Sequence, residues 1–211
     1  MPVIAVIDYE MGNLHSVCKG LEKAGATPKI THSSKDLQQA DAVILPGVGA
    51  FDPAMQHIRA RGLEQPIKEA IASGKPFLGI CLGLQILFES SEEGKLPGLG
   101  IIKGKVRRFI HEPGITIPHM GWNQLQLTQP KSILWEHLPY LPWVYFVHSY
   151  YVDPIDPQLR AAVVTHGNQT VTAAIAYDNL MAVQFHPEKS SNIGLQILSN
   201  FVSQVREKIP A

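Results

Sequence analysis

Cysteine is scarce in this chain, and it has neither a long apolar run nor an excess of charge of one sign. Only Cys18 and Cys81 occur among 211 residues, too few for a disulfide framework and typical of a reducing cytosol. No apolar run approaches the roughly 20 residues that span a bilayer. The first residues lack the basic segment and small-residue cleavage site of a signal peptide. We therefore expect a cytoplasmic protein without a membrane anchor.

The charge balance also limits the choice of partner. The 18 basic residues match the 18 acidic ones, so the formal net charge is zero. Proteins that bind nucleic acid or anionic membranes usually carry a basic excess, so we expect neither partner. Hydrophobic residues make up 45% of the chain, as in ordinary globular proteins. This length suits one domain with a large core, and we expect a single domain over residues 1–211.

The first half of the chain alternates between apolar runs and amphipathic helical patterns. The apolar runs predict buried strands at 3–7, 28–31, 42–45 and 76–80. The segments between them predict helices at 13–25, 33–40, 53–61 and 63–73. This alternation indicates an α/β fold, a doubly wound and mostly parallel sheet with helices on both faces. Sites in such sheets form beyond the carboxyl ends of the strands.

The pattern changes after residue 88. Residues 90–94 predict a polar loop, and a strand is expected near 105–109. Further short strands are predicted at 122–127, 143–147, 161–165, 171–177 and 181–185. Turn residues such as Gly167-Asn168 and Asp178-Asn179 indicate that the later strands form antiparallel hairpins. An amphipathic helix is expected at 194–208.

The most distinctive stretch surrounds Cys81, which lies between Gly79 and Gly83. The residues before it predict a strand, and residues 82–88 predict a buried helix. A sharp strand-to-helix turn of this kind carries the nucleophile of G-x-S-x-G enzymes, here with sulfur in place of oxygen. The start of the helix would favour the thiolate. Free cysteine is also often a buried packing residue, as we expect of Cys18, so this stretch alone leaves both roles open.

A cysteine nucleophile needs a general base and a group that orients the base. Of nine histidines, His186 follows a predicted strand and precedes Pro187, which holds the ring at the strand end. Glu188 can accept a hydrogen bond from that ring. Structural or solvated roles are expected for His15, His32, His57, His111, His137 and His166. No His, Cys and Asp cluster has metal-ligand spacing, so we expect neither a metal nor a cofactor.

Three motifs together resemble those of the class I glutamine amidotransferases: Gly79-x-Cys81-x-Gly83-x-Gln85, Pro46-Gly47-x-Gly49 and His186-Pro187-Glu188. The resemblance covers nearly the whole chain. It implies that Cys81 attacks the side-chain amide carbon of glutamine and that His186, oriented by Glu188, protonates the departing nitrogen. Water activated by His186 would then hydrolyse the thioester to glutamate. This pairing of motifs favours the nucleophilic role for Cys81.

The same resemblance implies how the oxyanion and the substrate are held. The oxyanion would accept from the backbone N–H of Leu82 and from one N–H in the segment Gly47-Val48-Gly49. Because glycines let a loop's peptides rotate, one peptide flip there would create or remove that donor.

The polar groups of glutamine would be held by Gln85 and by the backbone of Gly49, Ser149 and Tyr150. For Gln85 the alternative is a solvated helix residue. Its position one turn beyond the nucleophile favours contact with the substrate.

Four further stretches, at 8–14, 118–123, 145–150 and 188–191, resemble one branch of this class. Members of that branch supply ammonia to a separate (β/α)8-barrel synthase subunit in histidine biosynthesis. The resemblance implies a heterodimer in which the barrel subunit receives ammonia through a sheltered channel and joins it to a phosphoribulosyl aminoimidazole-carboxamide nucleotide. It also implies a glutaminase that is nearly inert until the liganded barrel subunit binds.

The branch also assigns residues to the partner interface: Asn13, His119, Met120, Trp122, Asn123, Tyr145 and Lys189. The residues alone leave this assignment open. Segment 118–123 has a loop-like context, and the alternative is a surface loop with Trp122 folded into the core.

Three alternative functions remain at this stage. The first is another class I glutaminase subunit, serving pyridoxal phosphate synthase or anthranilate synthase, against which the 118–123 and 145–150 motifs argue. The second is a cysteine peptidase or another hydrolase of the related doubly wound class, which would lack the pairing of Gln85 with the 46–49 loop. The third is a non-enzymatic binding module, against which the complete set of Cys81, His186 and Glu188 argues.

Overall fold

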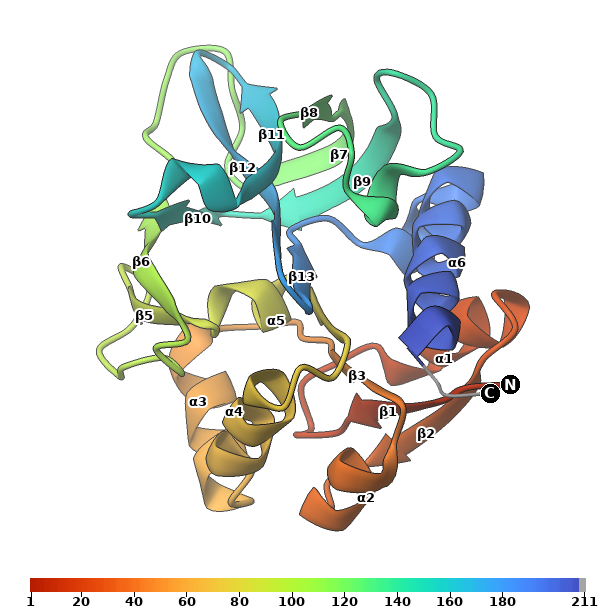
Figure 1. Cartoon of the computed structure of the whole chain (residues 1–211). Helices are drawn as coiled ribbons and strands as arrows, with labels where there is room; N and C mark the ends of the chain where they lie inside the picture. The colour runs from red at the N-terminus through yellow and green to blue at the C-terminus, as the bar shows by residue number, and fades with distance from the viewer. Residues whose placement is uncertain (209–211) are drawn as a thin grey trace.

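A central sheet organises residues 1–208, the part of the chain that this computed structural model describes (Figure 1). The strands of its first half are β1 Val3–Ile7, β2 Thr27–Thr31, β3 Ala42–Leu45 and β4 Phe77–Ile80. They lie in the order β2-β1-β3-β4, and every neighbouring pair is parallel. This confirms the predicted α/β fold with a parallel sheet.

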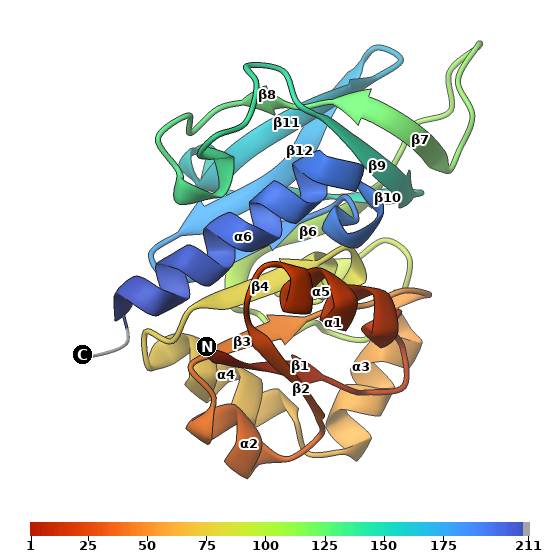
Figure 2. The ribbon, with the colours of Figure 1, turned by 90° about the vertical axis from the view of Figure 1, so that its right-hand side faces the viewer.

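Helices cover both faces of this parallel part. They are α1 Leu14–Lys23, α2 Ser34–Gln39, α3 Phe51–Ala60, α4 Glu64–Ala72 and the C-terminal α6 Ser191–Lys208. Helices α1 and α6 pack side by side on one face, and α2, α3 and α4 lie on the other (Figure 2). Alternate residues of β1 serve the two cores, since Ile4 and Val6 face α1 and α6 while Ala5 and Ile7 face the other layer.

Local signals account for the ends of α1. The Asn13 side chain accepts a hydrogen bond from the Ser16 N–H at 3.4 Å, which satisfies one free donor at the start of the helix. Gly25 follows the helix with φ +83°, a conformation that other residues rarely adopt.

The second half extends the sheet with strands of mixed direction. They are β5 Phe88–Ser91, β6 Ile102–Arg108, β8 Gln126–Leu127, β10 Tyr150–Pro154, β11 Arg160–His166, β12 Gln169–Tyr177 and β13 Leu180–Val183. Strand β13 lies parallel to β4 and antiparallel to β12, and β12 is antiparallel to β11. The predicted hairpins at Gly167-Asn168 and Asp178-Asn179 are therefore confirmed. The last strand returns to the centre of the sheet beside the Cys81 strand.

A separate ribbon of two antiparallel strands, β7 His119–Gln124 and β9 Trp143–His148, lies above the main sheet (Figures 1 and 2). Short 3-10 turns at Ile133–Trp135, Pro157–Leu159 and Pro187–Lys189 complete the connections. The ribbon corrects the prediction of a loop at 118–123, because its residues pair regularly with β9.

The structure also corrects the predicted helix at 82–88. Helix α5 is a single turn, Leu82–Gln85, and the chain enters strand β5 at Phe88. Phe88 pairs with Ile102 of β6, so tertiary strand pairing overrides the local helical pattern. Strand β5 also includes Ser90, where the sequence predicts a polar loop. Strand β10 had no counterpart among the predicted strands.

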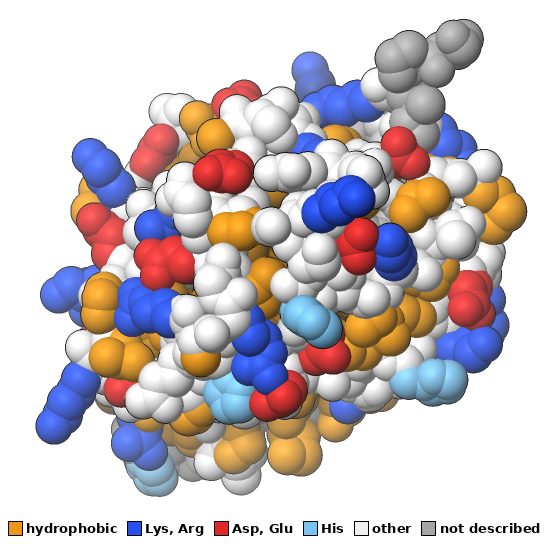
Figure 3. Space-filling view, turned by 90° about the horizontal axis from the view of Figure 1, so that it is seen from below, with side chains coloured by type: hydrophobic (Ala, Val, Ile, Leu, Met, Phe, Trp, Pro, Cys, Tyr) orange, Lys and Arg blue, Asp and Glu red, His pale blue; other side chains and the backbone are white. Residues whose placement is uncertain are grey.

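Charges on the helical layer are paired rather than gathered by sign. Seen from below, basic and acidic side chains are interspersed (Figure 3). Ion pairs there join Lys29 to Asp36 and both Arg59 and Lys68 to Glu64. Across the described residues, no helix combines the length and the apolar character that crossing a membrane requires.

Candidate active site

The turn that carries Cys81 links β4 to α5 and is held by its neighbours on all sides. Cys81 has φ +55°, a left-handed conformation that costs energy for a residue with a Cβ, and its N–H donates to the Val183 carbonyl at 2.8 Å. A Cβ at Gly83 would lie 1.8 Å from the Leu45 carbonyl oxygen, so only glycine fits there. A Cβ at Gly79 would lie 3.1 Å from the Gly83 carbonyl oxygen, a tight contact with backbone. Both glycines of the G-x-C-x-G pattern are therefore explained by sterics, because a side chain at either position would crowd backbone atoms.

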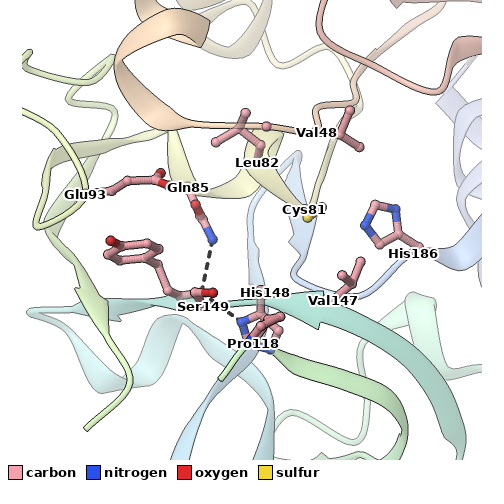
Figure 4. A pocket seen from close by; sticks show the side chains of 12 residues that line it. Val48, Cys81, Leu82, Gln85, Glu93, Pro118, Val147, His148, Ser149 and His186 are labelled. Carbon is pink, nitrogen blue, oxygen red and sulfur yellow. Dashed lines mark hydrogen bonds between the residues drawn. The ribbon is translucent and has the colours of Figure 1, made fainter. Parts of the chain in front are cut away.

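His186 and Glu188 lie just beyond the end of β13. The His186 ring faces the cavity across from the Cys81 sulfur (Figure 4). The His186 Nδ1 is 2.8 Å from a Glu188 carboxylate oxygen, and both side chains are only 2% exposed. Because a carboxylate only accepts, Nδ1 carries the proton. The Nε2 atom has no hydrogen-bond partner within residues 1–208 and is the free end of the ring. The His186 N–H donates to the Tyr145 carbonyl, which anchors the segment to β9.

The pKa of His186 reflects competing influences. Burial alone would lower it, but the neighbouring Cys81 sulfur and the Glu188 carboxylate outweigh burial and raise the pKa to about 10. The ring is therefore positively charged at neutral pH, next to the sulfur. A buried, protonated imidazole beside a cysteine is an arrangement suited to nucleophilic attack by sulfur.

The loop after β3 brings Gly47, Val48 and Gly49 to the same sheet edge. The Gly47 carbonyl accepts from the Leu82 N–H at 3.3 Å, and the Val48 N–H donates to the Met11 carbonyl at 3.1 Å. Both ends of the Gly47–Val48 peptide are therefore engaged. In this arrangement the N–H groups of Leu82 and Val48 point to protein carbonyls and not into an oxyanion hole.

Gln85 lies in the floor of the same site and is 5% exposed. Its Nε2 donates to the Tyr150 carbonyl at 3.1 Å (Figure 4). It also donates to the Gln184 Oε1 at 3.1 Å. The alternative of a solvated helix residue is therefore wrong for Gln85. Its amide nitrogen is fully used by the protein, so its Oε1 is the polar atom left for a ligand.

These elements enclose a cavity of about 300 Å³. Predicted site residues that line it are Val48, Gly49, Cys81, Leu82, Gln85, Ser149, Tyr150 and His186. Gly47 lies behind it, buried beneath Tyr9 and Leu82. Four lining residues were not predicted: Glu93, Pro118, Val147 and His148. The cavity therefore gathers Val48 and Gly49, the Cys81 turn and His186 at the carboxyl ends of β3, β4 and β13, and adds Ser149 and Tyr150 from the junction of β9 and β10.

Glu93 is the acidic group of this cavity that the sequence did not reveal. Its carboxylate accepts from the Phe51 N–H at 2.9 Å. Burial raises the pKa of Glu93, and the nearby Asp52 adds to the rise while the Phe51 N–H opposes it. The signal was the polar stretch at 90–94, an unusual feature immediately after a buried helix turn.

His119, which was predicted for the partner interface, is 4% exposed and lies inside the molecule. Its Nδ1 is 3.0 Å from the His148 Nε2, and its ring stacks on His166 with centroids 4.3 Å apart. The His148 Nδ1 donates to the Tyr150 carbonyl at 2.8 Å. Burial lowers the pKa of His119 to about 4 and that of His148 to about 3. Within residues 1–208, no three side chains of metal-ligand type converge on a common point.

The other predicted interface residues differ in their surroundings. Met120 and Trp122 are 61% and 49% exposed on the outer face of β7, where they pair with Val147 and Tyr145 of β9. Asn123 turns inward instead and donates to the Thr165 carbonyl at 2.9 Å. Asn13 caps α1, and Lys189 is exposed one residue beyond Glu188.

Comparison with known proteins identifies the family. The family model described as "Glutamine amidotransferase class-I" matches residues 5–205. Relatives from Nostoc punctiforme and Trichormus variabilis are 85% and 86% identical over 211 residues, 100% of this chain and of theirs. Both are described as "Imidazole glycerol phosphate synthase subunit HisH".

Solved structures agree on the fold at much lower identity. The glutaminase domain of a Trypanosoma brucei CTPS with bound acivicin aligns with a TM-score of 0.72 and 17% identity, over 100% of this chain and 96% of that chain. PurLQS from Thermotoga maritima aligns with a TM-score of 0.70 and 19% identity, over 98% of both chains. This chain belongs to the class I glutamine amidotransferases and, within them, to the HisH subunits of imidazole glycerol phosphate synthase.

Proposed function

We propose that this chain, acting as one amidotransferase domain, hydrolyses glutamine to glutamate and ammonia and supplies the ammonia to a synthase subunit in histidine biosynthesis. The observation that carries the chemistry is the meeting in one cavity of Cys81, His186 and Gln85, with Glu188 bound to the His186 ring from behind the cavity wall. A nucleophile, a base with its orienting acid and an amide-binding group are the parts that acyl transfer from glutamine needs.

The mechanism follows from the atoms that face the cavity. The Cys81 thiolate attacks the side-chain amide carbon, and the His186 Nε2 gives its proton to the departing nitrogen. His186 then takes a proton from water, which attacks the γ-glutamyl thioester and releases glutamate. Glu188 stays on Nδ1 throughout, holding the ring and stabilising its charged form.

Substrate recognition is assigned to both walls of the cavity. Glutamine carries an α-ammonium group, and Glu93 offers a half-buried carboxylate whose charge that group would complement. The Oε1 of Gln85 accepts from an N–H of the substrate, and the backbone of Gly49, Ser149 and Tyr150 supplies the remaining polar contacts. The volume of about 300 Å³ suits a single amino acid.

The Gly47–Val48 peptide is proposed as the switch of this glutaminase. As it stands, its carbonyl occupies the Leu82 N–H and its own N–H is held by Met11. A flip of this one peptide frees the Leu82 N–H and turns the Val48 N–H towards the substrate, which creates both oxyanion donors at once. Removing one such donor typically costs about 3–4 kcal/mol of transition-state stabilisation, so the unflipped chain is nearly inert.

The partner is proposed to be a separate (β/α)8-barrel synthase subunit in a cytoplasmic heterodimer. The word "subunit" in the relatives' names supports a partner, and the two free cysteines support a reducing compartment. The exposed apolar side chains of Met120 and Trp122, with Tyr145 and Lys189 near them, supply a docking face beside the cavity mouth.

The test compares glutamine hydrolysis by the isolated chain with hydrolysis in the presence of the barrel subunit and its nucleotide ligand. We expect little glutamate from the chain alone and rapid, Cys81-dependent turnover in the complex. Full activity of the isolated chain would overturn the switch, and activity of Cys81→Ala would overturn the glutaminase mechanism. A peptidase would instead cleave an unstructured protein substrate, which we expect this chain to leave intact.

A further inference from the structure

Gln184 is a buried polar residue in contact with the reacting sulfur. It lies between the end of β13 and His186 and is 0% exposed. Its Nε2 is 3.7 Å from the Cys81 sulfur, and its Oε1 accepts from the Gln85 Nε2 at 3.1 Å. Its backbone N–H donates to the Ala173 carbonyl at 2.8 Å, which fixes the residue to β12. The mechanism above does not use it.

The orientation of both amides is set by one backbone carbonyl. The Tyr150 carbonyl can only accept, so Gln85 must turn its NH2 group towards it. The second hydrogen of that NH2 points to Gln184, which must therefore present its Oε1. The NH2 group of Gln184 is left facing the sulfur. The alternative orientation would bring two acceptors or two donors together, so the network excludes it.

A fixed N–H donor changes the chemistry of a cysteine. Hydrogen bonds to a charged acceptor are roughly twice as strong as those to a neutral one, so the donor favours thiolate over thiol. The helix that follows Cys81 is a single turn, Leu82–Gln85, and its dipole is correspondingly small. The sulfur therefore depends on the groups beside it, the Gln184 amide that donates to it and the neighbouring His186 ring.

We propose that Gln184 is a further catalytic residue, which donates a hydrogen bond to the Cys81 thiolate and holds Gln85 so that only its Oε1 faces the substrate. The assignment rests on the proposed glutaminase mechanism, in which Cys81 is the nucleophile. A purely structural role for Gln184 would affect folding stability and leave the reactivity of the sulfur unchanged. Reactivity of Cys81 is therefore the quantity that separates the two roles.

The first experiment measures alkylation of Cys81 by iodoacetamide as a function of pH, in a Cys18→Ser background so that one thiol reacts. In Gln184→Met, which keeps the volume but removes the donor, we expect the half-maximal pH to rise by about one unit and the rate at neutral pH to fall about tenfold. Gln184→Glu, which places an acceptor beside the sulfur, should move the profile further. Gln126→Glu, an exposed change on β8, is the control and should leave the profile unchanged. An unchanged profile in folded Gln184→Met overturns the proposal.

A second measurement avoids any substitution at Gln184. In the unsubstituted chain, the side-chain N–H resonances of Gln184 should move with pH at the same midpoint as Cys81 alkylation. That movement should disappear in Cys81→Ala, whereas resonances of the exposed Gln126 amide should not respond in either protein. Gln184 resonances that ignore the ionisation of Cys81 would overturn the proposal even if the Gln184 variants fail to fold.

Different experimental results would refute the glutaminase mechanism and the role of Gln184. If Cys81→Ala still hydrolyses glutamine in the complex, the glutaminase mechanism is wrong. If Cys81 is required but neither Gln184→Met nor the amide resonances show a link to its ionisation, only the role of Gln184 is wrong.

Discussion

The Cys81 turn and the Gly47–Gly49 loop lie against each other but are held in opposite ways. The turn is crowded by backbone, since a Cβ at Gly83 would lie 1.8 Å from the Leu45 carbonyl oxygen. The loop is crowded at Gly47, which is buried beneath Tyr9 and Leu82, but its outer residues are open, with Val48 39% exposed and only the terminal methyl of Met11 near a Cβ at Gly49. Backbone contacts cannot yield without moving a strand, whereas hydrogen bonds of a surface peptide exchange readily.

The difference separates the nucleophile from its control. In the proposed mechanism, the sulfur stays fixed between the His186 ring and the Gln184 amide while the Gly47–Val48 peptide decides whether an oxyanion is stabilised. A glutaminase built in this way changes its rate without dismantling its active site. Each prediction below tests one side of this contrast.

The largest effect on glutamine turnover is expected when the sulfur of Cys81, on the crowded turn, is replaced. Cys81→Ser keeps the shape of the turn but replaces a thiolate with a poorly acidic hydroxyl, so glutamine turnover in the complex should fall at least about a thousandfold. Glutamate release measures the change, and circular dichroism checks the fold. Cys18→Ser, which alters the other cysteine, should keep its activity. Retention of a tenth of the activity by Cys81→Ser would contradict the prediction.

The next effect concerns the crowding around the turn. Gly83→Ala should lower the free energy of unfolding by at least about 3 kcal/mol, because its Cβ meets backbone atoms that cannot move away. Gly62→Ala is the matched control, since Gly62 has φ +64° but nothing within 4 Å, and should cost only about 1 kcal/mol. Urea unfolding compares the two. Equal losses would mean that crowding does not hold the turn.

A third effect tests the opposite wall of the cavity, where hydrogen bonds between buried histidines replace crowding. His119 and His148 have pKa values lowered to about 4 and about 3. Between pH 6.5 and these values, the two side chains therefore bind protons in the unfolded chain but stay neutral in the folded chain. Their contribution therefore leaves stability unchanged above pH 6.5 and lowers it as pH falls from 6.5 towards these values, by up to roughly 1.4 kcal/mol per pH unit for each histidine.

Urea unfolding at a series of pH values checks this slope in the unsubstituted chain and in His119→Gln. The variant should be less stable at neutral pH but should lose less stability on acidification. His186, whose raised pKa acts in the opposite sense, is present in both proteins and cancels in the difference. Parallel slopes would show that His119 is not held neutral.

The smallest effect on stability is expected on the open side. Gly49 has φ +104°, so Gly49→Ala should cost about 1–2 kcal/mol of unfolding free energy and should also hinder the peptide flip, lowering turnover in the complex. Val48→Ala, which trims an exposed side chain, should stay within about 0.5 kcal/mol of the unsubstituted chain. If Gly49→Ala lowers the free energy of unfolding as much as Gly83→Ala does, the loop and the turn are held equally firmly and the prediction is wrong.

The parts of this structure that depend on local sequence pattern could be predicted. Strands at Val3–Ile7 and Ala42–Leu45 have the predicted bounds, because short β-rich apolar runs end there in polar or turn residues. The Cys81 turn and the His186–Glu188 pair were equally local, each contained within a few residues. Their proximity was implied by the family resemblance, and the structure accounts for it because β13 lies parallel to β4.

Contacts between segments that are far apart in the chain could not be predicted from the sequence. Gln184 meets Gln85 across 99 residues and Cys81 across 103, and nothing in its own neighbourhood marks it as a donor. His119 was missed for a different reason. A strand at 119–124 turns alternate side chains inward, so His119 would have been placed inside had the segment been interpreted as a strand and not as a loop.

The paired strands β7 and β9 connect the wall of the cavity with the exposed surface beside it. Val147 lines the cavity and is paired directly with Met120, and the next outward pair along the ribbon is Tyr145 with Trp122. Successive outward positions on a strand lie about 6.8 Å apart. In the proposed heterodimer, a partner that rests on Met120 would therefore also cover the cavity at Val147, so docking and closure of the mouth would coincide. Ammonia released beneath that partner would meet the docked surface before it meets bulk water.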